Sequence, residues 1–478
     1  MKWRKIAIAL LLWVTLPGGA SAAEAPVDGK SNAGSVRTSP NIVFILADDM
    51  GWPDLSCYGN KFIETPVIDR LASEGILFTD FYAATPVCSS TRSTIQTGQY
   101  SGRTGITDFI PGHWRPYEKL IVPKIDHHLK AGIKTPGNAL GESGYVTGHF
   151  GKWHLGNQPN KHGYQITERA LGSAFAKWHP SKELGPKRID FLTDASIWFI
   201  EQNRDQPFFL TVSHFAVHIP LEARESTISK YEEKEKPVEG VNNPRYAAMT
   251  DDLDASVGRI LETLKDLDLA KNTIVVFASD NGGLRQMYTK VGELVSSNAP
   301  LRDEKGSLYE GGIRSPFIVR WPGVVKPGTV SHEPSTTADL LPTFCEMAGL
   351  KLQAQTIDGT SLVKVLKNPD AAQIIVEPRA GALSIDSGRS LVGIPSLPIP
   401  IPFAGAVTSP ELSLYTADRQ YSVAKIALLA YDAETRKHRF STGPLEGQSY
   451  HHFYRFLGFF NWKSTDIQEK SRTFFKNN

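Results

Sequence analysis

The chain has 478 residues, which is enough for one large domain and a smaller one around a sizeable buried core. Hydrophobic residues make up 41% and charged residues 21%, with a formal net charge of +2, so the charge balance indicates neither a nucleic-acid nor a membrane partner. The three cysteines, Cys57, Cys88 and Cys345, are too few for a fold held together by disulfides, and their odd number leaves at least one thiol unpaired.

The first 22 residues have the pattern of a secretory signal peptide. A basic start is followed by an apolar run over residues 6–16 and by Ala-Ser-Ala at 20–22, a small-residue cleavage site. The run is too short to span a bilayer, and no later apolar stretch is long enough for a transmembrane helix. Removal of this segment, which has three basic and no acidic residues, takes the net charge from +2 to about −1. We therefore expect a secreted or periplasmic protein without stable membrane insertion.

After a leader predicted to be flexible over residues 23–40, strand and helix patterns alternate. Thr65 and Pro66 are predicted to cap and start a helix that runs to residue 74, and apolar residues at helical spacing predict another over 251–267. This alternation predicts an α/β fold with a mostly parallel central sheet flanked by helices. Short apolar runs predict its buried strands at residues 42–47, 208–212, 273–278 and 317–319.

Polar side chains follow three of the predicted strands. They are Asp48 and Asp49 after the first strand, His214 and His218 after the second, and Asp280 and Asn281 after the third. Because ligands in such sheets bind at the carboxyl ends of the strands, we expect these clusters to converge on one site.

The acidic residues at these strand ends predict a metal site. Asp48 and Asp49 are adjacent carboxylates that repel each other unless a hard cation neutralises them, and Asp280 and Asn281 add further oxygen ligands. Oxygen ligands without a Cys and His pattern favour one Ca²⁺ or Mg²⁺ over zinc. Each pair alone is equally compatible with a turn, since Asp, Asn and Gly favour turns, but the two pairs together favour a metal.

Cys88 lies in the segment Thr-Pro-Val-Cys-Ser-Ser-Thr-Arg, residues 85–92. If Cys88 begins a helix, Arg92 lies one turn further along the same face. The helix amino end and the guanidinium would then surround Cys88 with positive potential suited to an anion. A lone buried cysteine, however, is more often inert packing.

The pattern Cys-Ser-x-x-Arg-x-x-x-x-Thr-Gly that starts at Cys88 resembles the signature of the type I sulfatases of the alkaline phosphatase superfamily, in which this cysteine is oxidised to formylglycine. The resemblance implies an arylsulfatase-type sulfuric ester hydrolase, a sulfated carbohydrate or aryl sulfate as substrate, and a formylglycine-generating maturation enzyme as partner. It covers about residues 41–366, and its further motifs follow in the family's order at 41–51, 151–156, 218–220, 280–282 and 301–306.

The resemblance also implies a role for each site residue. One cation would be held by the modified Cys88 together with Asp48, Asp49, Asp280 and Asn281.

The remaining roles concern charge and proton transfer. By resemblance, Arg92 would stabilise the hydrated aldehyde, and His154 would be the base that removes the proton of its second hydroxyl. Lys152, Lys305 and His218 would contact sulfate oxygens or the leaving oxygen. The ordinary alternative for both lysines is a solvated surface charge. No motif of the family matches His149, His162 and His214, which are interpreted as structural or substrate-side residues.

Two features depart from the family. The oxidation motif usually has Pro, sometimes Ala, two residues after the cysteine, where this chain has Ser90, so we expect the usual maturation enzymes to modify Cys88 less efficiently. Residues 41–369 are predicted to be the catalytic domain, but residues 370–478 do not match the usual small antiparallel domain with its helix.

The tail is either a divergent subdomain or unrelated sequence joined to a truncated sulfatase, and we favour the second interpretation. Its proline-dense segment 392–402 should be extended and outside a sheet interior, and 423–431 is a plausible strand. The aromatic-rich segment 451–462 predicts no role.

Two other functions remain open from the sequence. A phosphate ester hydrolase of the same superfamily would share the oxygen ligands. A non-catalytic protein that binds sulfated glycans would result if Cys88 stayed a thiol.

Overall fold

The computed structural model describes residues 39–113, 124–179, 183–286, 294–352 and 356–369, and the backbone of 374–394, 398–401, 405–408, 412–432, 438–441, 445–457 and 460–465. The predicted signal peptide and nearly all of the leader lie outside these residues. Within them, no helix is both long enough and apolar enough to cross a membrane.

An eight-stranded sheet lies at the centre of the fold, in the order β5-β4-β6-β1-β7-β8-β2-β9. The first five strands in this order run parallel, whereas β8 runs antiparallel to both β7 and β2. The predicted mostly parallel sheet is therefore confirmed. The strands are β1 (Asn41–Ala47), β2 (Ile76–Phe78), β4 (Val146–Gly151), β5 (Ile166–Thr167), β6 (Phe208–Ser213), β7 (Thr273–Ser279), β8 (Phe317–Arg320) and β9 (Thr329–Ser331).

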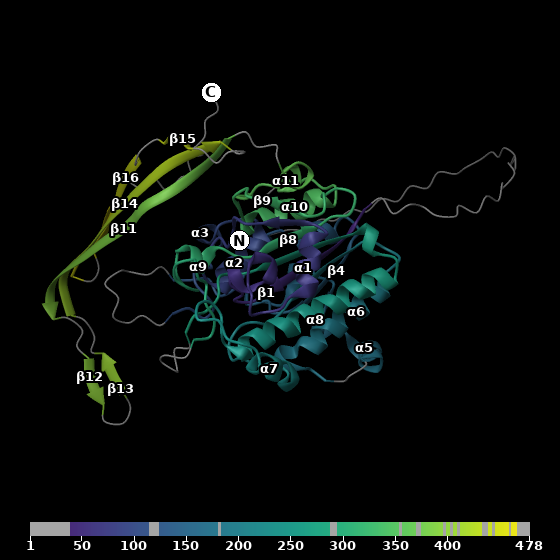
Figure 1. Ribbon diagram of the computed structural model, residues 1–478. Coiled ribbons are helices and arrows are strands. Elements are labelled where there is room, and N and C mark those ends of the chain that lie inside the picture. Colours follow the sequence, from purple (N-terminus) through teal and green to yellow (C-terminus); the bar gives the residue numbers. More distant parts are fainter. Residues whose placement is uncertain are drawn as a thin grey trace, which may run out of the picture. The chain divides into compact units, whose positions relative to one another are not determined.

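Helices cover both faces of this sheet (Figure 1). One face packs against α1 (Pro66–Ser73), α5 (Gly172–Trp178), α6 (Ile189–Gln202), α7 (Glu225–Glu232) and α8 (Pro244–Asp266). The other packs against α2 (Cys88–Thr97), α4 (Pro136–Gly141), α10 (Leu340–Met347) and α11 (Val363–Lys367). Shorter elements are β3 (Phe81–Tyr82), β10 (Ser335–Thr336), α3 (Ser101–Thr104) and α9 (Glu310–Ile313).

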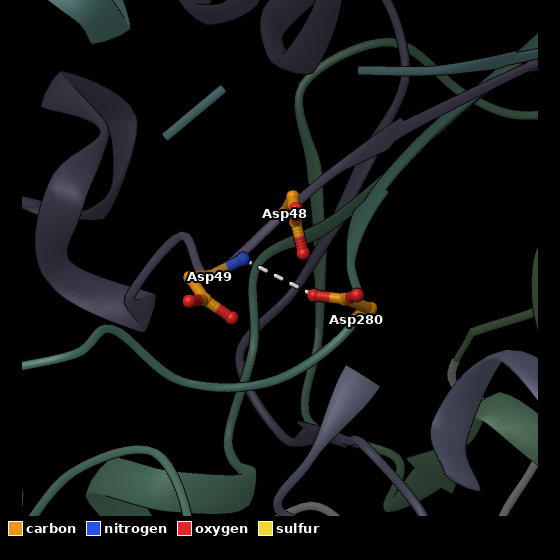
Figure 2. Close-up of side chains that lie close together, drawn as sticks. All are labelled: Asp48, Asp49 and Asp280. Atoms are coloured by element: carbon orange, nitrogen blue, oxygen red, sulfur yellow. Dashed lines mark hydrogen bonds between the residues drawn. The ribbon is translucent and has the colours of Figure 1, made fainter. Parts of the chain in front are cut away.

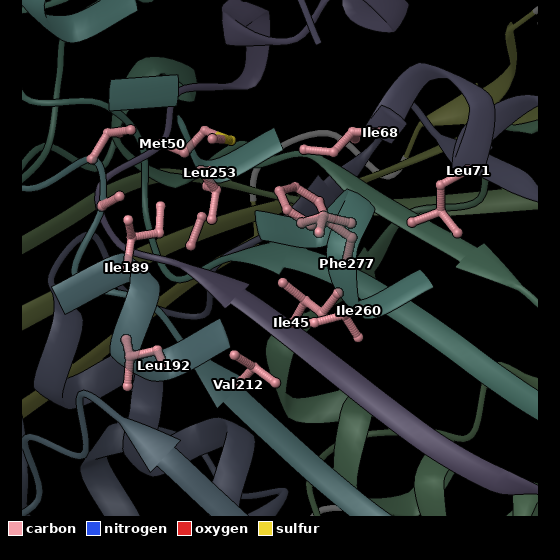
Figure 3. Packing of buried hydrophobic residues seen from close by; sticks show 14 of the residues in the cluster. Ile45, Met50, Ile68, Leu71, Ile189, Leu192, Val212, Leu253, Ile260 and Phe277 are labelled. Carbon is pink, nitrogen blue, oxygen red and sulfur yellow. The ribbon is translucent and has the colours of Figure 1, made fainter. Parts of the chain in front are cut away.

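The alternation of side chains along β1 assigns them to two separate cores. Val43 and Ile45 point into the cluster between the sheet and α8, where Ile45 lies near Ile260 and Phe277 (Figure 3). Ile42 and Phe44 point into the opposite cluster. Because both faces are apolar, the strand is a continuous hydrophobic run, as is typical of a parallel strand buried on both sides.

Two helices differ in detail from the prediction. The helix predicted over 251–267 starts earlier, at Pro244, because Asn243 caps it by accepting hydrogen bonds from two backbone N–H groups. Thr65 does precede α1, but its side chain makes no cap; the carboxylate of Asp254 instead accepts the N–H groups of Val67 and Ile68, at 3.0 and 2.8 Å.

Beyond residue 373 the described backbone is antiparallel sheet, of which the sequence predicted only one strand. The strand order is β11-β14-β16-β17, with β15 paired to β14, and β12 pairs with β13 separately. The proline-dense segment lies at the end of the edge strand β11 and in β12, in agreement with its predicted exclusion from a sheet interior. The bounds are β11 (Ile374–Ile394), β12 (Pro398–Ile401), β13 (Gly405–Thr408), β14 (Leu412–Asp432), β15 (His438–Ser441), β16 (Leu445–Phe456) and β17 (Phe460–Thr465).

Candidate active site

Three carboxylates meet at the carboxyl ends of two neighbouring strands (Figure 2). Asp48 and Asp49 leave β1 and Asp280 leaves β7, and each offers an oxygen within 4.8 Å of the others. Asp49 has a positive φ of 60°, and its backbone N–H donates to Asp280 Oδ1 at 3.1 Å. All three residues are at most 1% exposed, so their charges need compensation inside the protein.

Arg92 supplies part of that compensation from α2. Its Nε and Nη2 lie 2.8 and 2.7 Å from Asp280 Oδ2, and Nη2 lies 3.4 Å from Asp48 Oδ1. Nη1 donates to the Ser213 hydroxyl at 2.6 Å and to the Lys152 carbonyl at 2.7 Å. The guanidinium is therefore fixed between two carboxylates and two strand ends, one helical turn after Cys88 as predicted.

The two predicted lysines also enter the site, and neither is a solvated surface charge. Lys152 Nζ lies 2.7 Å from both oxygens of Asp48, and Lys305 Nζ lies 2.6 Å from Asp49 Oδ2. Their side chains are only 11% and 14% exposed. Although burial opposes it, the cations Lys152 and Arg92 hold the pKa of Asp48 below its usual value.

A glycine is required before Lys152. Gly151 ends β4 with a φ of 96°, and a Cβ at this position would collide with the carbonyl oxygen of Ser213. The close approach lets the Lys152 N–H donate to that same oxygen at 2.8 Å, which aims the lysine at Asp48.

The donor set fits a hard divalent cation. Asn281 Nδ2 donates to Asp49 Oδ1 at 2.7 Å, and Asn281 Oδ1 is buried without a hydrogen-bond partner among the described residues. A buried amide oxygen without a partner costs free energy, which coordination of a cation beside three carboxylates would recover. Asp48, Asp49, Asp280 and Asn281 thus form an all-oxygen set of the kind that Ca²⁺ and Mg²⁺ prefer.

Cys88 is the first residue of α2 and is 2% exposed, and its Sγ lies 3.3 Å from His154 Nδ1. Burial raises the pKa of the thiol, although Lys152 opposes this effect. The positive surroundings predicted from the sequence therefore do not ionise an unmodified Cys88. All three cysteines are free thiols, in agreement with the expectation that disulfides do not hold the fold.

His154 presents one ring nitrogen to Cys88. Its φ is 55°, and Nε2 lies 2.8 Å from the carbonyl oxygen of Ile110, which can only accept, so Nε2 carries the proton and Nδ1 is the free lone pair facing Cys88. Burial and Lys152 lower the pKa of His154 to about 4.

The other histidines differ in their distance from the site. His218 reaches the site from the loop after β6, with Nε2 3.5 Å from Asp49 Oδ2 and Nδ1 2.6 Å from the Ile219 carbonyl. His214, which we expected at the same cluster, has no contact with the site carboxylates; it is 1% exposed, and burial lowers its pKa to about 4. His149 and His162 are each 3% exposed in the core beside Trp153, as structural residues would be.

Comparison with known proteins assigns this site to a family. The family model described as Sulfatase matches residues 40–350. The chain belongs to the sulfatase family. N-acetylgalactosamine-6-sulfatase of Sus scrofa is 34% identical over 364 residues, which cover 68% of this chain and 66% of that protein. Arylsulfatase A of Homo sapiens is 30% identical over 378 residues, which cover 70% and 68%. The match to the first relative thus spans slightly less than two thirds of its length.

Solved structures show the same fold. That of Ps i-CgsB in complex with k-i-k-neocarrahexaose has a TM-score of 0.57 and 28% identity, and the match covers 80% of this chain and 84% of that one. The putative sulfatase yidJ from Bacteroides fragilis has a TM-score of 0.57 at 24% identity, which shows the fold alone.

The sequence motifs did not reveal the residues that position the side chains and backbone of the site. Ser213 ends β6 and accepts from Arg92, and Glu168 Oε1 accepts the N–H of Gly151 at 2.9 Å. Nothing in the local sequence distinguishes Ser213 from an ordinary strand residue. Glu168 lies 17 residues from its partner, so no local spacing predicts the contact.

Proposed function

We propose that this chain hydrolyses sulfate esters of sulfated glycans, using a formylglycine formed from Cys88 and one bound Ca²⁺ or Mg²⁺. The observation that carries the proposal is the position of Cys88. Cys88 begins α2, and its Sγ lies 3.3 Å from Nδ1 of the neutral His154. Three carboxylates, Arg92 and two largely buried lysines surround it. The relatives named N-acetylgalactosamine-6-sulfatase and the structure in complex with k-i-k-neocarrahexaose support a glycan substrate.

The formylglycine and the cation would supply the reactive groups, and the side chains around them would orient the substrate. A hydrated formylglycine at position 88 would supply two hydroxyls on one carbon, and a cation held by Asp48, Asp49, Asp280 and Asn281 would supply a Lewis acid. His154 accepts, at Nδ1, a proton from a hydroxyl at position 88, because its Nε2 is committed to the Ile110 carbonyl. Lys152, Lys305 and His218 stabilise the negative charge that grows on the sulfate and leaving oxygens.

The charge balance of the site suits a sulfate ester. Three carboxylates face three permanent cations, Arg92, Lys152 and Lys305, so the side chains alone are close to neutral. A divalent cation makes the site net positive, which attracts an anionic ester and holds the anion that is released. The same net positive charge favours anionic over neutral esters.

Mass spectrometry of the tryptic peptide 71–92, from protein exported by its native host, tests the proposal first. We expect loss of the Cys88 thiol and gain of an aldehyde that hydrazine reagents trap. Hydrolysis of an aryl sulfate should disappear in Cys88→Ala. Undiminished turnover in that variant, or a preference for phosphate over sulfate esters, would refute the assignment.

Ser90 supports a second function, binding without hydrolysis. If the native host leaves Cys88 alkylatable, the site would still hold a sulfated glycan through its lysines. Binding unchanged by Cys88→Ala, in a protein with no turnover to lose, would favour this function.

We further propose that residues 1–22 direct export, so that the protein is secreted or periplasmic, and that a formylglycine-generating enzyme of the same compartment matures it. Release of a chain lacking these residues into the culture medium or periplasm is the expected result. Retention in the cytoplasm would contradict it.

A further inference from the structure

A short segment beside the site carries a lysine to which the proposed mechanism gives no role. Lys187 lies in the single 3-10 turn Pro186–Arg188 (η5), just before α6. Its N–H points to Glu222 Oε2 at 3.4 Å, and Glu222 follows His218 in the loop after β6. One side of this turn is therefore attached to the loop that carries His218 into the site.

The next residue attaches the turn to the other side of the site. Arg188 Nη2 lies 3.0 Å from Glu168 Oε2, while Glu168 Oε1 accepts the N–H of Gly151, the residue before Lys152. The Arg188 guanidinium also lies over the ring of Phe215, 6.0 Å from its centre, in the loop after β6. The turn that carries Lys187 is thus tied both to the residue before Lys152 and to the loop that carries His218.

The backbone of the turn is strained. Lys187 and Arg188 are consecutive non-glycine residues in the left-handed region, with φ of 52° and 58°. Such conformations persist where the surroundings fix them and are enriched at functional sites. The contacts of Glu168 with Arg188 and of Glu222 with the Lys187 N–H hold the turn in this conformation.

The ammonium group of Lys187 takes part in none of the ion pairs formed by the residues that the structure describes. No carboxylate of the described residues lies within ion-pairing distance of it, although the side chain is half-buried. Burial lowers the pKa of Lys187, and Glu222, Asp48, Lys152 and Asp49 are close enough to influence it. Arg92, Lys152 and Lys305, in contrast, each have a carboxylate within 2.7 Å.

A cation that is partly dehydrated and unpaired favours an anion from outside the chain. The sulfate ester itself is already provided for by Lys152, Lys305 and His218 in the proposed function, on which this inference rests. We infer that Lys187 is a specificity-determining residue, which binds a second anionic group, a sulfate or a carboxylate, carried by the same glycan as the scissile ester. The substrate class is accordingly a polyanionic glycan rather than one with an isolated sulfate.

Equilibrium binding to the full-length, metal-loaded chain tests the inference, in a Cys88→Ala background that prevents turnover. The one-anion ligand is N-acetylgalactosamine 6-sulfate. The two-anion ligands are its 4,6-disulfate and the 6-sulfated chondroitin disaccharide, whose second anion is a carboxylate. The variants are Lys187→Gln, Lys187→Arg and, as a control for charge, Lys271→Gln, since Lys271 is exposed before β7 at the opposite edge of the sheet.

We expect the parent to bind at least one two-anion ligand about tenfold more tightly than the one-anion ligand, as for one charge-assisted contact. Lys187→Gln should remove this preference and leave one-anion binding within about twofold, whereas Lys187→Arg and Lys271→Gln should retain it. If Lys187→Gln weakens binding of the 4,6-disulfate, the second anion is a sulfate. If it weakens binding of the chondroitin disaccharide, the second anion is a carboxylate. Equal losses for all ligands, or no preference in the parent, would overturn the inference. A different result would refute the proposed function: matured protein with Cys88 intact would hydrolyse none of these three sulfated ligands.

Discussion

Ser90 is the residue at which the chain departs from the family's oxidation motif, and its effect on the free energy of unfolding can be measured with Ser90→Ala. It is the third residue of α2, fully buried, and its hydroxyl has no hydrogen-bond partner among the described residues. A buried hydroxyl without a partner costs about 1–3 kcal/mol, and Ala is about 0.5 kcal/mol more favourable than Ser in a helix. The vacated space offsets a few tenths of this gain, so Ser90→Ala should raise the free energy of unfolding by about 1–3 kcal/mol.

Urea denaturation of the full-length chain, in a Cys88→Ala background that keeps maturation out of the comparison, measures this change. Ser89→Ala is the matched control. Ser89 is equally buried on the same helical turn, but its Oγ accepts the N–H of Ile110 at 3.0 Å, so its loss should destabilise by about 1 kcal/mol. A destabilising Ser90→Ala, similar to Ser89→Ala, would show that Ser90 has a partner and refute the reasoning.

Further predictions concern maturation, the metal and pH. With Cys88 intact, Ser90→Ala should raise the aldehyde fraction of peptide 71–92, and an unchanged fraction would show that Ser90 does not limit maturation. Exhaustive chelation should suppress hydrolysis, and full activity in metal-free protein would contradict the oxygen ligand set. Asn281→Ala should lower the metal content measured by plasma mass spectrometry. Burial raises the pKa of Asp54 from 3.8 to about 7, although hydrogen bonds from Tyr246 and Gly51 oppose it. The folded state therefore keeps a proton that the unfolded state releases between these values, and the free energy of unfolding should fall by up to about 4 kcal/mol as pH rises through this window. Asp54→Asn should abolish that fall in urea denaturation at pH 4.5 and 7, and an unchanged slope would show that other groups cause it.

The sequence predicted, for a physical reason, that these acidic residues would meet at one edge of the sheet. Asp48 and Asp280 each end an apolar run that is buried on both faces, and such runs are the strongest strand signal in an α/β chain. Once both strands are parallel neighbours, their polar ends must share one edge of the sheet. The same logic failed for His214. Leu46 is paired with Ser213, so His214 is level with Ala47, one residue before Asp48. Successive side chains of an extended chain point to opposite faces, and His214 therefore points away from the face that carries Asp48.

What the sequence could not predict depends on contacts between distant segments. Asp254 caps α1 across 187 residues, and Glu168 joins Gly151 to Arg188 through one carboxylate. Neither contact has a local spacing that a pattern could detect. The left-handed turn at Lys187 is equally invisible, since non-glycine residues adopt it only where tertiary contacts hold them there.

The remaining question is whether the chain needs residues beyond 369 to fold, since we propose that 41–369 are the catalytic domain. In the described part of the chain, every member of the two hydrophobic clusters lies between Ile42 and Leu366. All the site residues lie in the same interval. A chain that ends at residue 369 should therefore unfold cooperatively in urea, at a midpoint close to that of the full-length protein, and keep its metal. Aggregation of the truncated chain, rescued by restoring residues 370–478, would instead show that the tail covers apolar surface of the domain and would favour a divergent subdomain over unrelated sequence.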